Sequence, residues 1–364
     1  MSSGADWEAV LVTLAMFALM GIGLPIFIAI GAAALVGLWL VFGLQQAMVD
    51  FTSFLWQSLD SFELVTIPLF VTAAMLVQES EVGDELFDFA KVWVGSLSNG
   101  LGVAVIMTCA IFAGITGSSP VTAVTVGLIA LPVLAREGYP DKVRGALIAG
   151  GGTLGILLPP SVPLIIYGLL TQTSIGSLFI ATILPGLLLA TMFSLYVMLF
   201  SRPRVRAGRF TWQQRFQALW RAFPVVVLPV FIIGSIYSGL VTPSETGAVA
   251  AVYVLILGLA RRRLDLVRIA RAARASALTS SMLLMIFGMG SVFARYTAIL
   301  QLPQRLASAV SHIQGGPLVV FTGIVVADLV MGTFLESGAM TILTIPIFFP
   351  IAMAIGLNPV QFGV

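Results

Sequence analysis

Long apolar runs recur along the whole chain and are separated by short polar or basic segments. A helix needs about 20 apolar residues to cross a bilayer, whereas a membrane strand shows about 10 alternating ones. The first run, residues 10–42, is broken at Gly21–Pro25, which predicts a tight helical hairpin. The pattern indicates an all-α polytopic membrane protein, with further spans at 62–78, 98–116, 121–135, 145–170, 178–201, 222–240, 243–260, 276–298, 316–334 and 339–356. Segments 83–93 and 302–313 are amphipathic instead.

Composition supports this class and excludes others. Of 364 residues, 59% are hydrophobic and 9% are charged, which is about a third of the usual charged share in soluble domains. The single cysteine, Cys109, excludes a disulfide framework and a cysteine-based metal cluster. With His312 as the single histidine, most hydrolase and metal-site designs are excluded too, and we expect no enzyme.

Basic residues predict the orientation. Arginines gather at 202–221 and 261–274, a smaller group spans 136–144, and Lys91 lies on the first amphipathic segment. The positive-inside rule places all of these in the cytoplasm and leaves Arg295 and Arg305 outside. Ser174 and Ser311 are then expected in the periplasm. No nucleic-acid partner is expected, because the basic segments lack interleaved aromatic residues.

The segments 98–116 and 121–135 lie between two groups of cytoplasmic charges. Two full spans would satisfy this, and so would a re-entrant hairpin that turns at Gly117–Pro120. The second arm is short and the turn sequence GITGSSP is polar. We favour the re-entrant hairpin because of this short arm and polar turn. Polar backbone at membrane depth is tolerated only where protein or a water-filled cavity surrounds it.

An offset of 218 residues relates two parts of the chain. It pairs Pro25 with Pro243, Gly114 with Gly332, and residue 132 with residue 350, which are both proline. Segment 98–116 begins on the cytoplasmic side, whereas its mate 316–334 follows the two outer arginines. The sequence therefore predicts inverted repeats, an architecture of secondary transporters whose binding sites lie at the repeat interface.

Three broken segments could carry chemistry: Gly114–Ser119, Gly150–Tyr167 with its Pro-Pro pair, and Gly332–Ala339. Interrupted helices leave carbonyl oxygens that suit a small cation and N-termini that attract an anion. Glu336 fits a cation ligand or a structural acceptor equally well. Glu245, just after Pro243, is expected to cap a helix start.

The chain resembles the large membrane subunit of TRAP transporters, the tripartite ATP-independent periplasmic type. The resemblance covers essentially the whole chain and rests on GIGLP at 21–25, TIPLF at 66–70, IFAGITGSS at 111–119, the long match at 136–168, TPSETGA at 242–248 and GTFLESGAMTILTIPIFFPIAMAIGLNPVQFGV at 332–364. It implies an elevator-type sodium symporter of the bacterial inner membrane. It also implies a periplasmic binding protein, a small membrane subunit and a small organic anion such as a dicarboxylate or sugar acid.

The same resemblance suggests site residues. Sodium would be bound first by Thr116, Gly117, Ser118, Gly155, Leu158 and Pro160, and second by Gly332, Thr333 and Glu336. The substrate would contact Ser119, Thr122, Ser161 and Ser337. No cofactor besides the coupling sodium ions is expected. Residues 1–61 and 178–275 would form the scaffold, and 62–177 and 276–364 the two transport repeats.

By the repeat logic, the mate of residues 147–201 would follow residue 364, so about 55 residues are expected beyond this sequence. A fragment or a truncated protein would explain this, and the second repeat is interpreted as incomplete. A channel or a stand-alone transporter of similar fold is the alternative function, and sodium coupling would separate a symporter from a channel.

Overall fold

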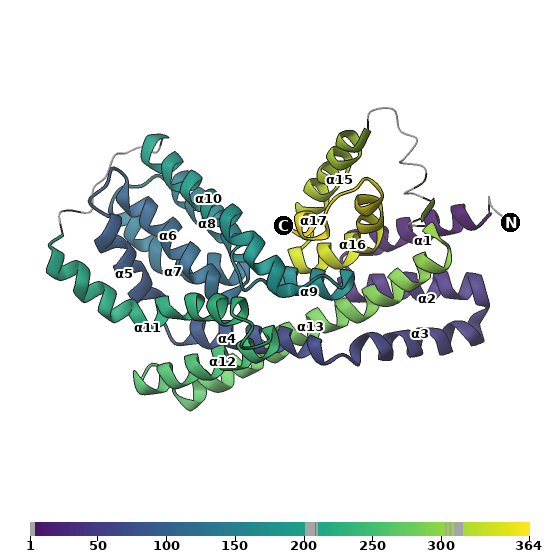
Figure 1. Ribbon diagram of the computed structural model, residues 1–364, viewed down its shortest axis with the longest axis horizontal. Helices are drawn as coiled ribbons and strands as arrows, with labels where there is room; N and C mark the ends of the chain where they lie inside the picture. Colours follow the sequence, from purple (N-terminus) through teal and green to yellow (C-terminus); the bar gives the residue numbers. More distant parts are fainter. Residues whose placement is uncertain (1–3, 201–207, 209, 303, 306–307, 309–315) are drawn as a thin grey trace. The chain divides into compact units, whose positions relative to one another are not determined.

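The computed structural model describes residues 4–200, 208, 210–302, 304–305, 308 and 316–364, in which all regular structure is helical (Figure 1). Within these residues, eight helices are long and apolar enough to cross a membrane, which confirms the all-α polytopic class. Residues 309–313, with Ser311 and His312, lie outside the described part.

The chain forms two compact units. Unit 1 contains Met1–Val65, Ile166–Ser174 and Thr279–Gly363, and unit 2 contains Thr66–Ile165 and Ile175–Leu278.

Unit 1 is built from short helices around the second half of a long one. Its elements are α1 (Gly4–Gly21), α2 (Ile26–Phe42), α3 (Leu44–Leu59), the 3-10 helix η1 (Phe62–Val65), the end of α13 (Leu266–Ile299), α15 (Gly316–Gly332), α16 (Ser337–Ala354) and α17 (Pro359–Gly363). The break between α1 and α2 confirms the predicted N-terminal hairpin. Glycines on α2 allow it to pack tightly on α13, since a Cβ on Gly31 would lie 2.7 Å from the sulfur of Met289.

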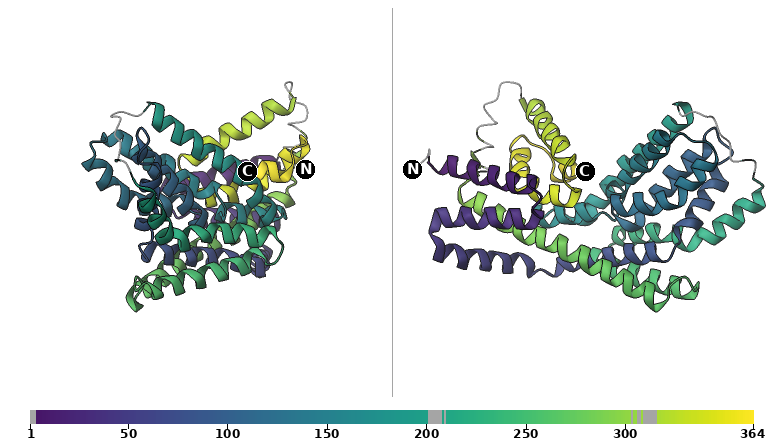
Figure 2. Two further views of the ribbon diagram at one scale, coloured as in Figure 1. Left: turned by 60° about the vertical axis from the view of Figure 1, so that its left-hand side comes forward. Right: turned by 180° about the vertical axis from the view of Figure 1, so that it is seen from behind.

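Unit 2 contains α4 (Thr66–Glu79), α5 (Gly83–Val94), α6 (Gly100–Thr116), α7 (Ser119–Arg136), α8 (Asp141–Leu157), the start of α9 (Val162–Thr171), α10 (Ile175–Phe200), α11 (Trp212–Tyr237) and α12 (Pro243–Ala260). The α6 helix is buried along almost its whole length and contacts α5, α7, α8 and α10 (Figure 2). This helix leads directly to one of the predicted sites.

The largest differences from the sequence prediction are one missed helix and two early helix starts. The α3 helix was not predicted, because its Gln, Asp and Ser residues interrupt any long apolar run. The α11 and α13 helices each begin about ten residues before the predicted spans at 222 and 276. Their first turns are polar and rich in arginine, and an apolar-run criterion does not register such turns although helix formation continues through them. Thr211 begins α11 as the N-cap of a capping box with Gln214.

The helix boundaries recur at the predicted offset of 218. The α7 and α16 helices begin and end at equivalent positions, and each contains a proline, Pro132 and Pro350. Each is followed by a glycine in the left-handed region, Gly138 with φ +78° and Gly356 with φ +83°. The repeat is therefore present in the helix boundaries, while its inverted sense stays a prediction.

The predicted structural role of Glu245 is confirmed. Thr242 is the N-cap of α12, and its hydroxyl accepts a hydrogen bond from the Glu245 backbone N–H at 3.3 Å. The Glu245 carboxylate in turn accepts from the Thr242 backbone N–H at 2.7 Å. This reciprocal arrangement satisfies two backbone donors at the helix start.

Candidate functional site

The α6–α7 hairpin turns through only two residues. The α6 helix ends at Thr116, and the Gly117 N–H donates to the Ala113 carbonyl at 3.0 Å. Gly117 has φ +59°, a left-handed conformation that glycine adopts at no steric cost. Ser118 is extended and α7 begins at Ser119. The sequence GITGSSP thus forms a tight tip that contains three hydroxyl residues, Thr116, Ser118 and Ser119.

The second element is the interruption between α8 and α9. The α8 helix ends at Leu157, α9 begins at Val162, and the four residues between them are buried. Two consecutive prolines cause the break, because neither has a backbone N–H and each clashes with a preceding helical turn. Ser161, the last residue of the break, is fully buried at 0% exposure.

The hairpin tip and the helix break are in direct backbone contact. The Val162 N–H donates to the Gly117 carbonyl at 3.3 Å. A Cβ built on Gly155 would lie 2.5 Å from the Ser118 carbonyl oxygen, and one on Gly117 would collide with the Pro160 carbonyl oxygen. Glycine at these two positions is therefore what allows the two backbones to approach each other.

Oxygen atoms dominate this contact. The Thr116 hydroxyl lies 3.0 Å from the Thr122 hydroxyl and donates to the Phe112 carbonyl at 3.1 Å. The buried hydroxyls of Ser119, Thr125 and Ser161 have no hydrogen-bond partner among the described residues. Buried polar atoms are rarely left unpaired in proteins, and two of these hydroxyls, those of Ser119 and Ser161, belong to the tip and the break. Thr125 was not predicted, because a threonine one turn along a helix looks like an ordinary packing residue.

The predicted residues fall into two sets in different units. The structure brings together nine of them at the tip and the break in unit 2: Thr116, Gly117, Ser118, Ser119, Thr122, Gly155, Leu158, Pro160 and Ser161. The other four, Gly332, Thr333, Glu336 and Ser337, lie on the α15–α16 loop in unit 1. Within the described residues, no group of three or more His, Cys, Asp or Glu side chains could hold a metal ion.

The α15–α16 tip is more open than the α6–α7 tip. Gly332, Thr333 and Glu336 are exposed, and the intervening Phe334 is 85% exposed. The Thr333 hydroxyl donates to the Val330 carbonyl at 2.7 Å, and Glu336 occupies the N-cap position of α16. The two alternatives for Glu336, cation ligand or structural acceptor, both stay predictions.

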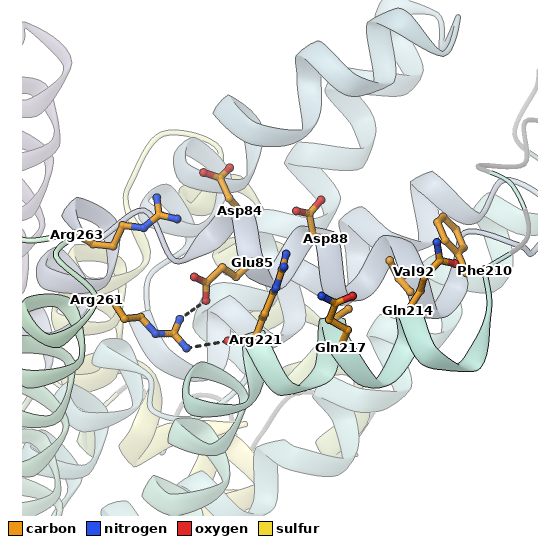
Figure 3. Close-up of a pocket in the computed structure, with 11 residues that line it drawn as sticks. Asp84, Glu85, Asp88, Val92, Phe210, Gln214, Gln217, Arg221, Arg261 and Arg263 are labelled. Atoms are coloured by element: carbon orange, nitrogen blue, oxygen red, sulfur yellow. Dashed lines mark hydrogen bonds and ion pairs between the residues drawn. The ribbon is translucent and has the colours of Figure 1, made fainter.

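A cavity of about 670 Å³ lies elsewhere in unit 2, between α5, α11 and the segment after α12 (Figure 3). Arg261 bridges its wall by donating to the Glu85 carboxylate and to the Arg221 carbonyl oxygen. Burial, and next the nearby Asp88, raise the pKa of Asp84 above its ordinary value. The lining of this cavity therefore contains acidic and basic side chains and an ion pair between Arg261 and Glu85. The sequence did not predict this ion pair, because α5 and residue 261 are far apart in the chain.

Known proteins extend these observations. Residues 13–364 match the family profile described as Tripartite ATP-independent periplasmic transporter, DctM component. The chain is 35% identical over 318 residues to the C4-dicarboxylate TRAP transporter large permease protein DctM of Pseudomonas aeruginosa, covering 85% of this chain and 73% of that protein. It is 30% identical over 352 residues to the ectoine TRAP transporter large permease protein TeaC of Halomonas elongata, covering 96% and 82%.

One solved structure has a related fold. The crystal structure of the YdaH transporter of Alcanivorax borkumensis matches with a TM-score of 0.56 at 15% identity, covering 88% of this chain and 76% of that one. At this identity the likeness supports the fold alone.

A transporter subunit, and not an enzyme, accounts for both the family match and the apolar helices. Its location is the bacterial inner membrane, which it crosses several times. The chain therefore belongs to the DctM component family of the tripartite ATP-independent periplasmic transporters.

Proposed function

We propose that this chain couples sodium entry to the import of a small organic anion, delivered by a periplasmic binding protein and supported by a small membrane subunit. Dicarboxylates and sugar acids are the expected substrate class. The family assignment supports tripartite transport, and the neutral, oxygen-rich contact between the α6–α7 tip and the α8–α9 break supports sodium coupling.

The charge of that contact favours a monovalent cation. Calcium and magnesium sites in proteins usually contain carboxylates, whereas the atoms gathered here are carbonyl and hydroxyl oxygens. The carbonyl oxygens of Ser118 and Pro160 lie close to glycines of the opposing segment. A sodium ion would satisfy such oxygens without requiring a buried negative charge.

Helix polarity divides the same region into two parts. The C-terminal ends of α6 and α8, at Thr116 and Leu157, carry partial negative charge, and the N-terminal ends of α7 and α9 carry partial positive charge. We infer that the carbonyl oxygens near Thr116 to Ser118 and Gly155 to Pro160 bind the cation. The hydroxyls of Ser119, Thr122 and Ser161, beside the helix N-termini, then suit the carboxylate of the substrate.

The 218-residue repeat makes the α15–α16 tip the counterpart of the α6–α7 tip, so we assign it a matching role. Gly332, Thr333 and Glu336 would bind a second cation, and Ser337 at the N-terminus of α16 would bind the substrate. This assignment rests on the 218-residue offset.

Sodium binding can be tested without knowing the substrate. A ligand that binds the folded state raises its stability in proportion to RT ln(1 + [L]/Kd). The purified chain should unfold at a higher temperature in sodium chloride than in potassium or choline chloride of equal ionic strength. Equal unfolding temperatures in the three salts would contradict sodium binding, and hence the proposed coupling.

A further inference from the structure

A second cavity, of about 410 Å³, lies in unit 1 between the end of α3, η1, the end of α9 and the C-terminal part of α13. This volume is in the range that small-molecule sites occupy. Leucine, alanine and phenylalanine side chains form much of its wall, and the polar groups of Ser58, Gln172 and Ser291 also line it. Apolar walls with a few converging polar groups are typical of a solute site.

Two opposite charges line this cavity, Glu63 on η1 and Arg295 on α13. The Arg295 guanidinium lies over the Phe54 ring, 5.2 Å from its centroid, in a cation–π contact. Among the described residues, neither side chain takes part in a hydrogen bond or an ion pair, and they are not paired with each other. Both side chains are exposed at the cavity wall, so a guanidinium donor group and a carboxylate acceptor group are accessible to a solute that enters it.

We propose that this cavity recognises a small zwitterionic solute, whose carboxylate binds Arg295 and whose cationic nitrogen binds Glu63. The guanidinium fork matches a carboxylate in a two-point contact. A dianion could use the same fork, but its second carboxylate would then meet the carboxylate of Glu63, and like charges held close disfavour binding. The pair thus selects a solute with both signs over one with two negative charges.

This inference rests on the proposed transport function, but it replaces the dicarboxylate and sugar-acid class proposed above with amphoteric carboxylic acids. The sequence predicts that Arg295 lies outside the cytoplasm, on the side from which the binding protein would deliver the solute. Amphoteric and dianionic solutes both occur in the names of the relatives, as ectoine and C4-dicarboxylate.

Binding of two probes to the full chain in nanodiscs tests the proposal by calorimetry. Ectoine carries one carboxylate and one delocalised cation, and succinate carries two carboxylates. We expect the wild-type chain to bind ectoine more tightly than succinate. Glu63→Gln should weaken ectoine about tenfold or more, since a charge-assisted contact is lost, while leaving succinate unchanged or tighter. Arg295→Gln should weaken both probes.

Matched controls separate recognition from folding. Asp60→Asn changes an exposed acid on the same loop that does not line the cavity, and it should leave both affinities unchanged. Arg295→Lys keeps the charge but loses the planar fork, so it should retain part of the ectoine affinity. Only variants that unfold within a few degrees of wild type are compared. If Glu63→Gln does not fold, Glu63→Ala replaces it, because it also removes the negative charge.

Three results would overturn the proposal: no ectoine binding by the wild-type chain, equal loss of both probes in Glu63→Gln, or an unchanged ectoine affinity in that variant. Sodium-dependent stabilisation of the same preparations would still be observed if the proposed function holds. Its absence would instead contradict the function, so the two failures can be told apart.

Discussion

Replacing Gly155 by alanine tests whether the α6–α7 tip and the α8–α9 break form the cation site. Gly155 lies inside α8 with a helical backbone, so an added methyl group causes no strain in its own dihedral angles. Its Cβ would meet backbone atoms of the opposing tip, at 2.5 Å from the Ser118 carbonyl oxygen and 2.8 Å from the Ser119 Cα. Backbone atoms cannot rotate away as a flexible side chain can.

The size of the effect follows from this geometry. A carbon and a carbonyl oxygen approach to about 3.3 Å, so tip and break must separate by about 0.8 Å. Overpacking of this kind costs about 1–3 kcal/mol, with the rigid case at the upper end. Alanine also favours the helix by about 1 kcal/mol, but it does so equally in the free and the sodium-bound chain and leaves the affinity unchanged. If binding requires the unseparated geometry, a cost of about 2 kcal/mol or more lowers the sodium affinity about thirtyfold or more.

The assay is a sodium titration of the unfolding temperature, with choline chloride keeping ionic strength constant. Gly145→Ala is the matched control on the same helix, because a Cβ there would meet nothing within 4 Å. We expect the half-saturating sodium concentration to rise in Gly155→Ala and to stay at the wild-type value in Gly145→Ala. Identical titrations of the two variants would refute the site.

Three further predictions follow from other features. Ser161→Ala should lower the affinity for the carboxylate substrate about tenfold in binding measurements. The unfolding temperature should stay the same, because the Ser161 hydroxyl has no hydrogen-bond partner among the described residues. An unchanged affinity would argue against a role of this hydroxyl in substrate binding. Thr242→Val should lower the free energy of unfolding by about 1 kcal/mol through loss of the α12 capping box, measurable by denaturant titration, whereas an unaltered midpoint would mean that the cap contributes nothing. In intact cells carrying Cys109→Ala, an impermeant maleimide should label a cysteine at Ser174 and not one at Phe210, and the reverse pattern would overturn the charge-based orientation.

Residues that interrupt helices allowed much of this fold to be predicted. Glycine and proline at 21–25 separate α1 from α2, and the paired prolines before Ser161 end α8, because their backbone constraints act locally. The left-handed turn at Gly117 has the same origin. Such local causes are readable from sequence whatever the tertiary packing.

Features that depend on tertiary packing could not be predicted in this way. The α3 helix is amphipathic and short, so its apolar positions do not form a continuous run. The stacking of Arg295 on Phe54 joins helices that are far apart in the chain. Equally, the Thr125 hydroxyl has no hydrogen-bond partner in the described part of the chain, and this depends on how α7 packs in unit 2.

Sodium-driven accumulation of substrate tests the central claim most directly. The full chain would be reconstituted in proteoliposomes with its small subunit, and the binding protein loaded with labelled substrate would be added outside. We predict accumulation above the external concentration when sodium is higher outside, and its collapse when a sodium ionophore dissipates the gradient. Equal uptake with potassium replacing sodium, or uptake that stops at equal concentrations on both sides, would contradict sodium-coupled transport.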